Sequence, residues 1–151
     1  MLNLSWNDIH GDCDLLAQEI QNKFQESKFD LIIGVSRGGL IPACILSHIL
    51  DIPKVLSIGL SSYNKSKEQK SISCYQHIQP HDLFGKKILF VDELCDSSST
   101  LKYLKDQYGC FEDIDMHTAV LYVKEKAWFV PDYFVKKVPQ EEWIKFPYET
   151  E

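Results

Sequence analysis

Three acidic residues and a run of four hydroxyl residues lie within one short stretch of the chain, ILFVDELCDSSSTL, at positions 88–101. The apolar run Ile88–Val91 is typical of a buried strand, and it ends in Asp92 and Glu93, with Asp96 close behind. Hydroxyls and backbone N–H groups at the start of a helix suit a phosphate. Carboxylates suit sugar hydroxyls, a hard cation or a proton transfer. The segment therefore predicts a site for a phosphorylated sugar.

A simpler interpretation of the same stretch is that the hydroxyl residues cap a helix and that the acids are solvated. Capping leaves three acids at one strand end unexplained, so the ligand site is favoured. Cys95 lies between the acids, and packing is favoured there over a nucleophilic role because cysteine is among the residues most often buried. The hydroxyl residues are Ser97, Ser98, Ser99 and Thr100.

A second turn follows the apolar run Leu31–Val35 and precedes another helical segment. Its two glycines allow close approach of the backbone to a ligand, and its arginine can contact a phosphate through two N–H groups. No G-K-[ST] or G-x-G-x-x-G pattern is present, so it is neither a Walker loop nor a dinucleotide fingerprint. The carboxyl ends of parallel strands share one edge of a sheet, so the two turns are expected to meet. The residues of this turn are Ser36, Arg37, Gly38 and Gly39.

The segment Gly34–Gly38 also matches G-x-S-x-G, the nucleophile elbow of α/β-hydrolases, with His117 available as a base. Only one strand precedes this elbow in the expected order of elements, whereas several do so in that fold. The hydrolase interpretation is therefore disfavoured.

The elements that must position these residues alternate between helix and strand. Such alternation predicts an α/β domain with a mainly parallel sheet flanked by helices. The segment 61–71 is polar throughout and is expected to be a long loop, and the tail from Val138 is expected to be irregular. Helices are expected at 6–24, 40–50 and 101–108, and strands at 31–35, 55–60, 88–91, 118–123 and 133–135.

Composition limits the class of protein. The 151 residues are 44% hydrophobic and carry a net charge of −6, which argues against a nucleic-acid-binding protein. No apolar run is long enough for a transmembrane helix, and the first residues do not resemble a signal peptide. The five cysteines are odd in number and form no C-x-x-C pair, which favours reduced thiols in the cytoplasm.

The two turns together resemble a known family. VDELCDSSST is similar to the diphosphoribosyl-binding signature of type I phosphoribosyltransferases, and SRGGL is similar to their pyrophosphate loop. Within that family the chain resembles the small bacterial xanthine–guanine branch. SSYNKSKEQK is similar to its mobile loop, Lys124 in LYVK to its purine-contacting lysine, and PQEEWIKFP to its C-terminal segment. The resemblance covers nearly the whole chain, in the same order.

The resemblance implies a type I phosphoribosyltransferase fold, a twisted and mainly parallel sheet, as one domain over 1–151 with a small hood from 124–151. It implies transfer of the 5-phosphoribosyl group from 5-phosphoribosyl diphosphate to a 6-oxopurine (guanine, xanthine or hypoxanthine). It further implies Mg²⁺ as cofactor and a homodimer or homotetramer, with no nucleic-acid partner.

The resemblance also implies a role for each candidate residue. Asp92 and Glu93 would hold the ribose hydroxyls and Mg²⁺, and Asp96 would be the catalytic base on the purine. The 5′-phosphate would be cradled by Ser97, Ser98, Ser99 and Thr100. The diphosphate would be held by Ser36, Arg37, Gly38 and Gly39, and the purine by Lys124, Trp143 and Ile144.

Three residues depart from the family pattern: Glu93 stands for Asp, Ser97 for Thr, and Ser98 for Gly. The glycine lets the backbone wrap a phosphate, so Ser98 keeps open a second hypothesis, a protein of this fold that binds without turnover. A transferase for another nucleobase is a third, against which Lys124 and the pair Trp143–Ile144 argue. The sequence does not indicate which 6-oxopurine is preferred.

Overall fold

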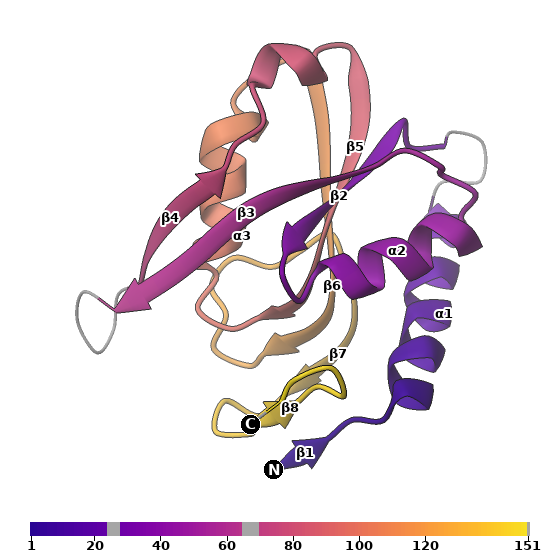
Figure 1. Ribbon diagram of the computed structural model, residues 1–151, viewed down its shortest axis with the longest axis vertical. Coiled ribbons are helices and arrows are strands. Elements are labelled where there is room, and N and C mark those ends of the chain that lie inside the picture. The colour runs from indigo at the N-terminus through magenta and orange to yellow at the C-terminus, as the bar shows by residue number, and fades with distance from the viewer. Residues whose placement is uncertain (24–27, 65–69, 151) are drawn as a thin grey trace.

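The computed structural model describes residues 1–23, 28–64 and 70–150. It is an α/β structure with a six-stranded sheet and a separate two-stranded sheet (Figure 1). The helices are α1 (Trp6–Lys23), α2 (Leu40–Ile49), the 3₁₀ turn η1 (Pro80–Leu83), α3 (Ser99–Leu104) and the π-helical turn η2 (Lys105–Gly109). The strands are β1 (Leu2–Asn3), β2 (Leu31–Ser36), β3 (Val55–Asn64), β4 (Lys70–Gln76), β5 (Lys86–Cys95), β6 (Ile114–Lys124), β7 (Tyr133–Val138) and β8 (Ile144–Lys145).

The large sheet has the strand order β4-β3-β2-β5-β6-β7. All neighbouring pairs are parallel except β3 and β4, which are antiparallel. The expected mainly parallel sheet is thus confirmed. From β2 the chain passes to β3 on one side, and it later returns to β5 on the other. This reversal creates the crevice at the carboxyl ends of β2 and β5 in which open α/β sheets bind ligands.

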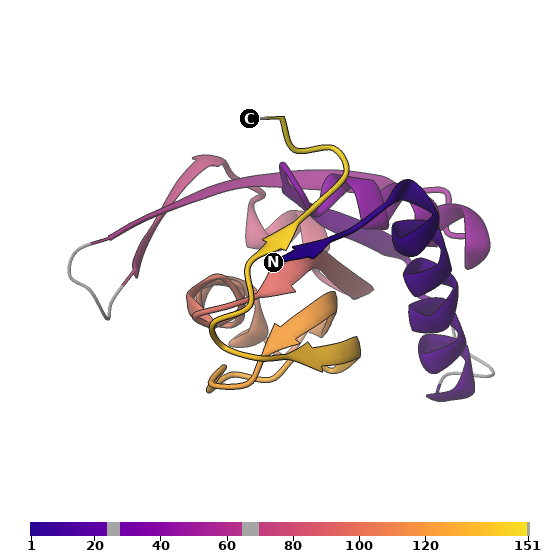
Figure 2. The ribbon, with the colours of Figure 1, turned by 90° about the horizontal axis from the view of Figure 1, so that it is seen from below.

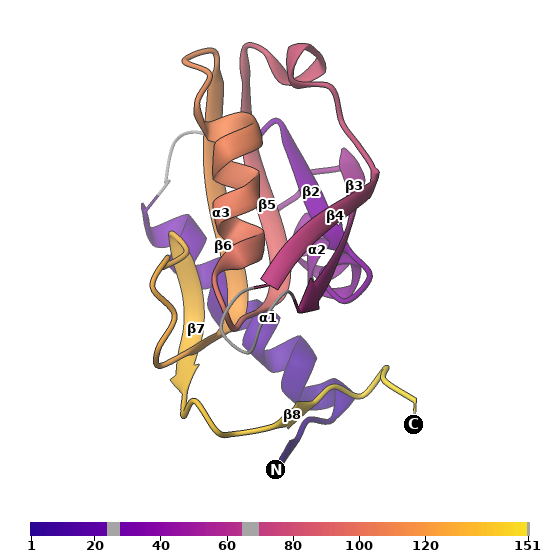
Figure 3. The ribbon, with the colours of Figure 1, turned by 90° about the vertical axis from the view of Figure 1, so that its left-hand side faces the viewer.

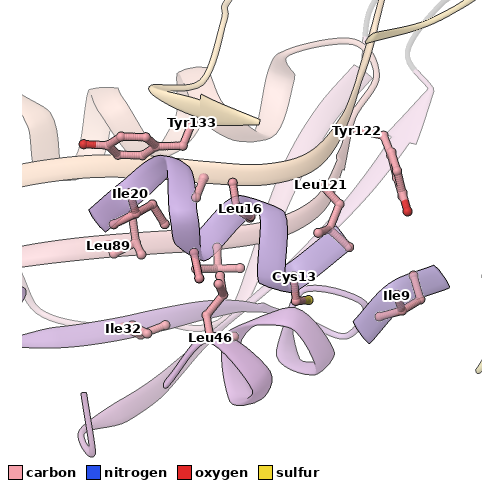
Figure 4. Packing of buried hydrophobic residues seen from close by; sticks show 14 of the residues in the cluster. Ile9, Cys13, Leu16, Ile20, Ile32, Leu46, Leu89, Leu121, Tyr122 and Tyr133 are labelled. Atoms are coloured by element: carbon pink, nitrogen blue, oxygen red, sulfur yellow. The ribbon is translucent and has the colours of Figure 1, made fainter. Parts of the chain in front are cut away.

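Helices cover both faces of the sheet. α1 and α2 lie on one face, and α3 with η2 lies on the other (Figure 3). The inward face of α1 carries Ile9, Cys13, Leu16 and Ile20 at helical spacing, all at most 2% exposed, and they pack in the main core (Figure 4).

Strand β5 is buried on both faces, which explains its continuous apolar run. Leu89 and Val91 belong to the core under α1 and α2, while Ile88 and Phe90 belong to the core under α3. This packing holds β5 in the centre of the sheet and brings the residues that follow Val91 to its carboxyl edge. The strand runs to Cys95, so the first two acids lie within it and not after it.

The prediction of a loop over 61–71 is wrong at both of its ends. β3 continues to Asn64 and β4 begins at Lys70, and the two strands form a hairpin that projects from the body of the molecule (Figure 2). Residues 65–69 lie outside the described residues, as does Phe24, the last residue of the first expected helix. The polar composition misled because only the part of the hairpin nearer the core, with Ile58, Leu60, Ile72 and Cys74, contributes apolar side chains to the packing under α3.

The tail is more regular than its composition indicates. β8 pairs in parallel with β1 at the other end of the chain, with Leu2 opposite Ile144 (Figure 2). Such a pairing between distant segments leaves no local pattern in either one. Among the helices in the described ranges, none combines the length and the apolar character needed to span a bilayer.

Candidate active site

The turn after β2, residues 36–39 (the β2 turn), needs glycine at position 39 for reasons of space. A Cβ on Gly39 would lie 2.6 Å from the carbonyl oxygen of Val35 and 2.5 Å from that of Val91 on the neighbouring strand. The backbone φ of Gly39 is −68°, a value open to any residue. Close packing of two strand ends, and not an unusual backbone angle, therefore excludes a side chain here.

The other residues of the β2 turn are approached by side chains from elsewhere in the fold. A Cβ on Gly38 would lie 2.2 Å from the carboxyl carbon of Glu93, so that carboxylate rests directly on the turn. The Ser36 hydroxyl accepts a hydrogen bond of 3.0 Å from the phenol of Tyr75 on β4. Arg37 is exposed, which leaves its guanidinium accessible to an anion.

The first two acids of β5 lie in an environment that disfavours their charge. Burial raises the pKa of Asp92 to about 8, although its Oδ1 accepts the N–H of Glu93 at 2.8 Å. Burial also raises the pKa of Glu93, and the Tyr148 phenol, which donates to its Oε2, opposes that rise. Two neighbouring carboxyls with raised pKa values are the arrangement that a bound cation or hydroxyl donors would stabilise in the ionised form.

The turn after β5, residues 96–100 (the β5 turn), contains a serine in a left-handed backbone conformation. Ser98 has φ 66° and ψ 0°, which favours glycine because a Cβ crowds the backbone there. Its hydroxyl accepts the N–H of Phe129 at 2.9 Å and donates to the carbonyl of the same residue at 3.2 Å. The side chain is 3% exposed. A phosphate contact from Ser98 would thus come from its backbone N–H.

Two of the remaining hydroxyl residues of the β5 turn, Ser97 and Ser99, are hydrogen-bonded to each other. Ser97 Oγ donates to Ser99 Oγ at 3.1 Å and accepts the Ser99 N–H at 3.5 Å. These bonds fix the chain where α3 begins, and Thr100 occupies the first turn of that helix. The helix start and its hydroxyls together offer donors to an anion.

Two adjoining cavities bring the two turns together. Both are bordered by the β5 acids Asp92 and Glu93, and Thr100 contributes to both. The structure therefore unites residues that are about 60 positions apart in the sequence. One cavity, of about 200 Å³, is lined by Ser62, Asp92, Glu93, Leu94, Cys95, Asp96, Ser97, Ser98, Thr100 and Leu101. The other, of about 220 Å³, is lined by Val35, Ser36, Arg37, Gly38, Leu60, Ser61, Ser62, Asp92, Glu93 and Thr100.

A glutamine from the tail connects Asp96 to Lys124. Gln140 Nε2 donates to Asp96 Oδ1 at 3.3 Å, and the Gln140 carbonyl accepts from Lys124 Nζ at 3.4 Å. Lys124 is 6% exposed and also donates to the carbonyl of Glu142. The lysine at the end of β6 therefore holds the chain that follows β7, next to the third acid.

The structure does not bring the expected tail residues to these two cavities. The Trp143 ring is 68% exposed, and the Trp143 carbonyl accepts the N–H of Leu2 at 2.8 Å. Ile144 is buried in the two-stranded sheet opposite Leu2. Their contact with a purine stays a prediction, as do the roles of the other site residues.

The sequence patterns did not indicate three residues that lie close to the site: Phe129, Gln140 and Tyr148. Gln140 lies in the recognised PQEEWIKFP segment, so its neighbourhood carried a signal. Phe129 acts through its backbone, which no side-chain pattern reveals. Tyr148 contacts Glu93, which lies 55 residues earlier in the chain, and no residue pattern around either position indicates that contact.

The two nucleophile hypotheses find no support in the geometry. His117 aligns with Leu89 and Ile32 in the sheet register, four residues short of the strand end that carries Ser36, and its Nε2 lies 2.8 Å from Asp115 Oδ1. Cys95 is 3% exposed, and burial raises the pKa of its thiol. The packing role expected for this cysteine fits its position.

Comparisons with known proteins agree with one another. The family model of the phosphoribosyl transferase domain matches residues 5–151. A xanthine-guanine phosphoribosyltransferase of Cereibacter sphaeroides is 33% identical over 150 residues, which are 97% of this chain and 86% of that protein. A purine phosphoribosyltransferase of Pyrococcus horikoshii superposes with a TM-score of 0.81 at 30% identity, covering 99% of this chain and 95% of that one. A hypothetical protein of Neisseria gonorrhoeae with bound ppGpp superposes with a TM-score of 0.77 at 28% identity, covering 99% and 90%.

Proposed function

Because the chain belongs to the phosphoribosyltransferase family, we propose that it transfers the 5-phosphoribosyl group from 5-phosphoribosyl diphosphate to a 6-oxopurine. The products are the nucleoside 5′-monophosphate and pyrophosphate, so the reaction serves purine salvage. One observation carries the proposal: the β2 turn and the β5 turn border the same pair of acids. A ligand with a phosphate at one end, a diphosphate at the other and a ribose between them matches that order of groups.

The β5 turn receives the 5′-phosphate, and the β2 turn receives the diphosphate. Donors at the start of α3, including Thr100, face the phosphate, and Arg37 supplies a paired contact to the diphosphate. Gly38 and Gly39 add no side chains of their own to the turn, and the Glu93 carboxylate lies against Gly38, so a diphosphate held here would lie beside that carboxylate and the cation that it would hold.

The reaction forms a bond between a nitrogen of the purine five-membered ring and the ribose anomeric carbon, as the bond from that carbon to the diphosphate oxygen breaks. The electron pair of the broken bond leaves with the pyrophosphate. The proton on the purine nitrogen passes to Asp96, the base next to the cradle, which contributes roughly 10²- to 10⁴-fold. Gln140 donates to Asp96 Oδ1 and orients that carboxylate. The neighbouring carboxylates Asp92 and Glu93 stabilise positive charge that develops on the ribose.

The residues fit Mg²⁺ as the cofactor. In the described residues, His, Cys, Asp and Glu form no cluster of three or more that could hold a metal alone. Mg²⁺ commonly takes one or two carboxylates and completes its shell with water and substrate phosphates. Asp92 and Glu93 would hold it, and the raised pKa of Asp92 marks a carboxyl to which a cation would restore the charge. The ion would neutralise the diphosphate as it leaves.

The purine lies toward Lys124 and the tail. An ammonium has three N–H donors, and the carbonyls of Gln140 and Glu142 take two of those of Lys124. The third N–H donates to the 6-oxo group of the purine. Adenine carries a 6-amino group at that position, which is a poor hydrogen-bond acceptor. Residues 124–151 form the hood of a single domain over 1–151, with Trp143 and Ile144 at the purine.

We place the protein in the cytoplasm, since all five cysteines are free in the structure. We further propose a homodimer or homotetramer, whose interface could cover exposed apolar side chains such as Leu15, Val55 and Leu56.

The test is a turnover assay with 5-phosphoribosyl diphosphate, Mg²⁺ and each of guanine, xanthine, hypoxanthine, adenine and uracil. We expect pyrophosphate and a nucleotide of matching mass from one or more of the 6-oxopurines, and none from adenine or uracil. If the protein binds 5-phosphoribosyl diphosphate but turns over none of the bases, the result would instead support the second hypothesis, a protein of this fold that binds without turnover. Turnover of adenine or uracil alone would establish a transferase for another base.

A further inference from the structure

The C-terminal segment reaches the site through one tyrosine. The Tyr148 phenol donates a hydrogen bond to Glu93 Oε2, and a third cavity, of about 350 Å³, opens beside this contact. The cavity extends the site past the β2 turn, toward the end of the chain. It is lined by Arg37, Gly38, Ile41, Glu93, Tyr148, Glu149 and Thr150.

Packing fixes the position of the Tyr148 ring. It stacks on Phe146 with ring centroids 5.5 Å apart and planes 19° apart, and it lies 5.8 Å from the ring of Trp6. Phe146 is itself 2% exposed and packs 6.0 Å from Tyr122 in the core. The phenol oxygen is therefore held by a row of aromatic rings that ends in the core, and not by a freely moving tail.

Glu93 is held from two sides. Its carboxylate rests on Gly38 of the β2 turn, where a Cβ would come within 2.2 Å, and its Oε2 receives the phenol. The other oxygen, Oε1, also lies against Gly38. Glutamate is one methylene longer than the aspartate expected at this position, and that extra length lets the carboxylate reach across the turn. The side chain thereby joins β5, the β2 turn and the C-terminal segment.

We infer that Tyr148 is a positioning residue that fixes the Glu93 carboxylate over the β2 turn and thereby sets the affinity for 5-phosphoribosyl diphosphate. The inference rests on the proposed function, since it assigns Glu93 to the ribose and the cation. By occupying Oε2, the phenol leaves Oε1, which lies against the β2 turn, as the oxygen that would meet the substrate or the cation. Without the phenol, Glu93 can rotate away from the turn, and binding must first reorder it.

The contact also has an electrostatic consequence. The charged or titratable groups that face Glu93 are Asp92 on its own strand, Arg37 from the β2 turn, and Tyr148 with Glu149 from the tail. Burial raises the pKa of Glu93, the phenol lowers it, and Glu149 raises it. The phenol thus favours the ionised carboxylate, which burial and Glu149 disfavour.

Tyr148→Phe removes the hydroxyl and keeps the ring in its stack. We expect KM for 5-phosphoribosyl diphosphate to rise about fivefold, the worth of one such hydrogen bond, with kcat and KM for the purine changed less than twofold. Tyr122→Phe is the matched control, since it removes a phenol that donates to Asp12 outside the site and should alter none of these quantities.

A second measurement separates this inference from the proposed function. Calorimetric titration with 5-phosphoribosyl diphosphate and Mg²⁺ measures the affinity whether or not any base is turned over. A Kd about fivefold higher in Tyr148→Phe than in the parent and in Tyr122→Phe supports the inference even if no base is turned over, a result that would overturn only the proposed function. An unchanged Kd, or an unchanged KM in an active enzyme, would overturn the inference.

Discussion

The β2 turn and the β5 turn follow neighbouring parallel strands at the same edge of the sheet, but they depend on glycine in different ways. In the β2 turn, Gly39 is required because a Cβ would meet two strand carbonyls, while its φ is ordinary; at Gly38 a Cβ would meet only the carboxylate of Glu93, which can move. In the β5 turn the backbone is left-handed at residue 98, where glycine is expected, and serine is found. The serine hydroxyl compensates through two hydrogen bonds to Phe129.

Glycine thus serves two separate purposes in sites of this kind, and only one of them can be replaced. Lack of space cannot be relieved by a side chain, however polar. A left-handed backbone costs about 1–2 kcal/mol for other residues, and hydrogen bonds of a buried hydroxyl can offset that amount. The departure of Ser98 from the family pattern is therefore compatible with a working turn.

The largest effect is expected from Gly39→Ala. Its Cβ would meet two backbone carbonyls that cannot move without displacing β2 and β5, so we expect a loss of about 3 kcal/mol in the free energy of unfolding, measured by urea denaturation. Gly11→Ala is the control, because a Cβ there meets nothing within 4 Å in helix α1 and should stabilise by about 1 kcal/mol. Equal stability of the two variants would refute the requirement for space in the β2 turn.

The next largest effect is expected from removing the proposed base, Asp96, which belongs to the β5 turn. Asp96→Asn retains an oxygen for Gln140 and should reduce kcat by about 10²-fold, with affinity for 5-phosphoribosyl diphosphate nearly unchanged. Single-turnover kinetics and equilibrium titration measure the two quantities. A loss of less than threefold in kcat would remove Asp96 from the role of base.

The β5 acids also make stability depend on pH. The pKa of Asp92 is about 8 in the folded protein and about 3.9 in the unfolded chain, so the folded state binds the extra proton between these values. Stability of the ligand-free protein should therefore fall as pH rises from about 4 to 8, as thermal melting would show. Asp92→Asn should flatten most of this slope, and a parent protein that gains stability over the same range would contradict the assignment.

The smallest effect separates the two contributions of residue 98. Ser98→Ala keeps the Cβ in the left-handed backbone and loses both hydrogen bonds to Phe129, which should cost about 1–2 kcal/mol. Ser98→Gly loses the same bonds and relieves the backbone, so it should be more stable than Ser98→Ala by about 1 kcal/mol. If chemical denaturation showed Ser98→Ala and Ser98→Gly to be equally stable, a Cβ in the left-handed backbone at residue 98 would have no free-energy cost.

The sequence allowed the site to be predicted where its signals are local. An apolar strand followed by acids and hydroxyls, and a second strand followed by glycines, led to the edge of the sheet at which the two cavities lie, because parallel strands end together. The contacts that hold these segments in place join distant positions, such as Ser98 with Phe129 and Tyr148 with Glu93, and no spacing reveals them. The β3–β4 hairpin was missed for a different reason, since the apolar residues of β3 and β4 that pack under α3 are separated by the polar stretch 61–71.

The central claim is that the two turns hold the two ends of one substrate, and calorimetric titration of its halves tests this most directly. Arg37→Ala should weaken pyrophosphate binding in Mg²⁺ about tenfold and leave ribose 5-phosphate unaffected. Thr100→Val should weaken ribose 5-phosphate about fivefold and leave pyrophosphate unaffected. If each variant weakened both ligands equally, or if the parent protein bound neither half, the division of the substrate between the β2 turn and the β5 turn would be wrong.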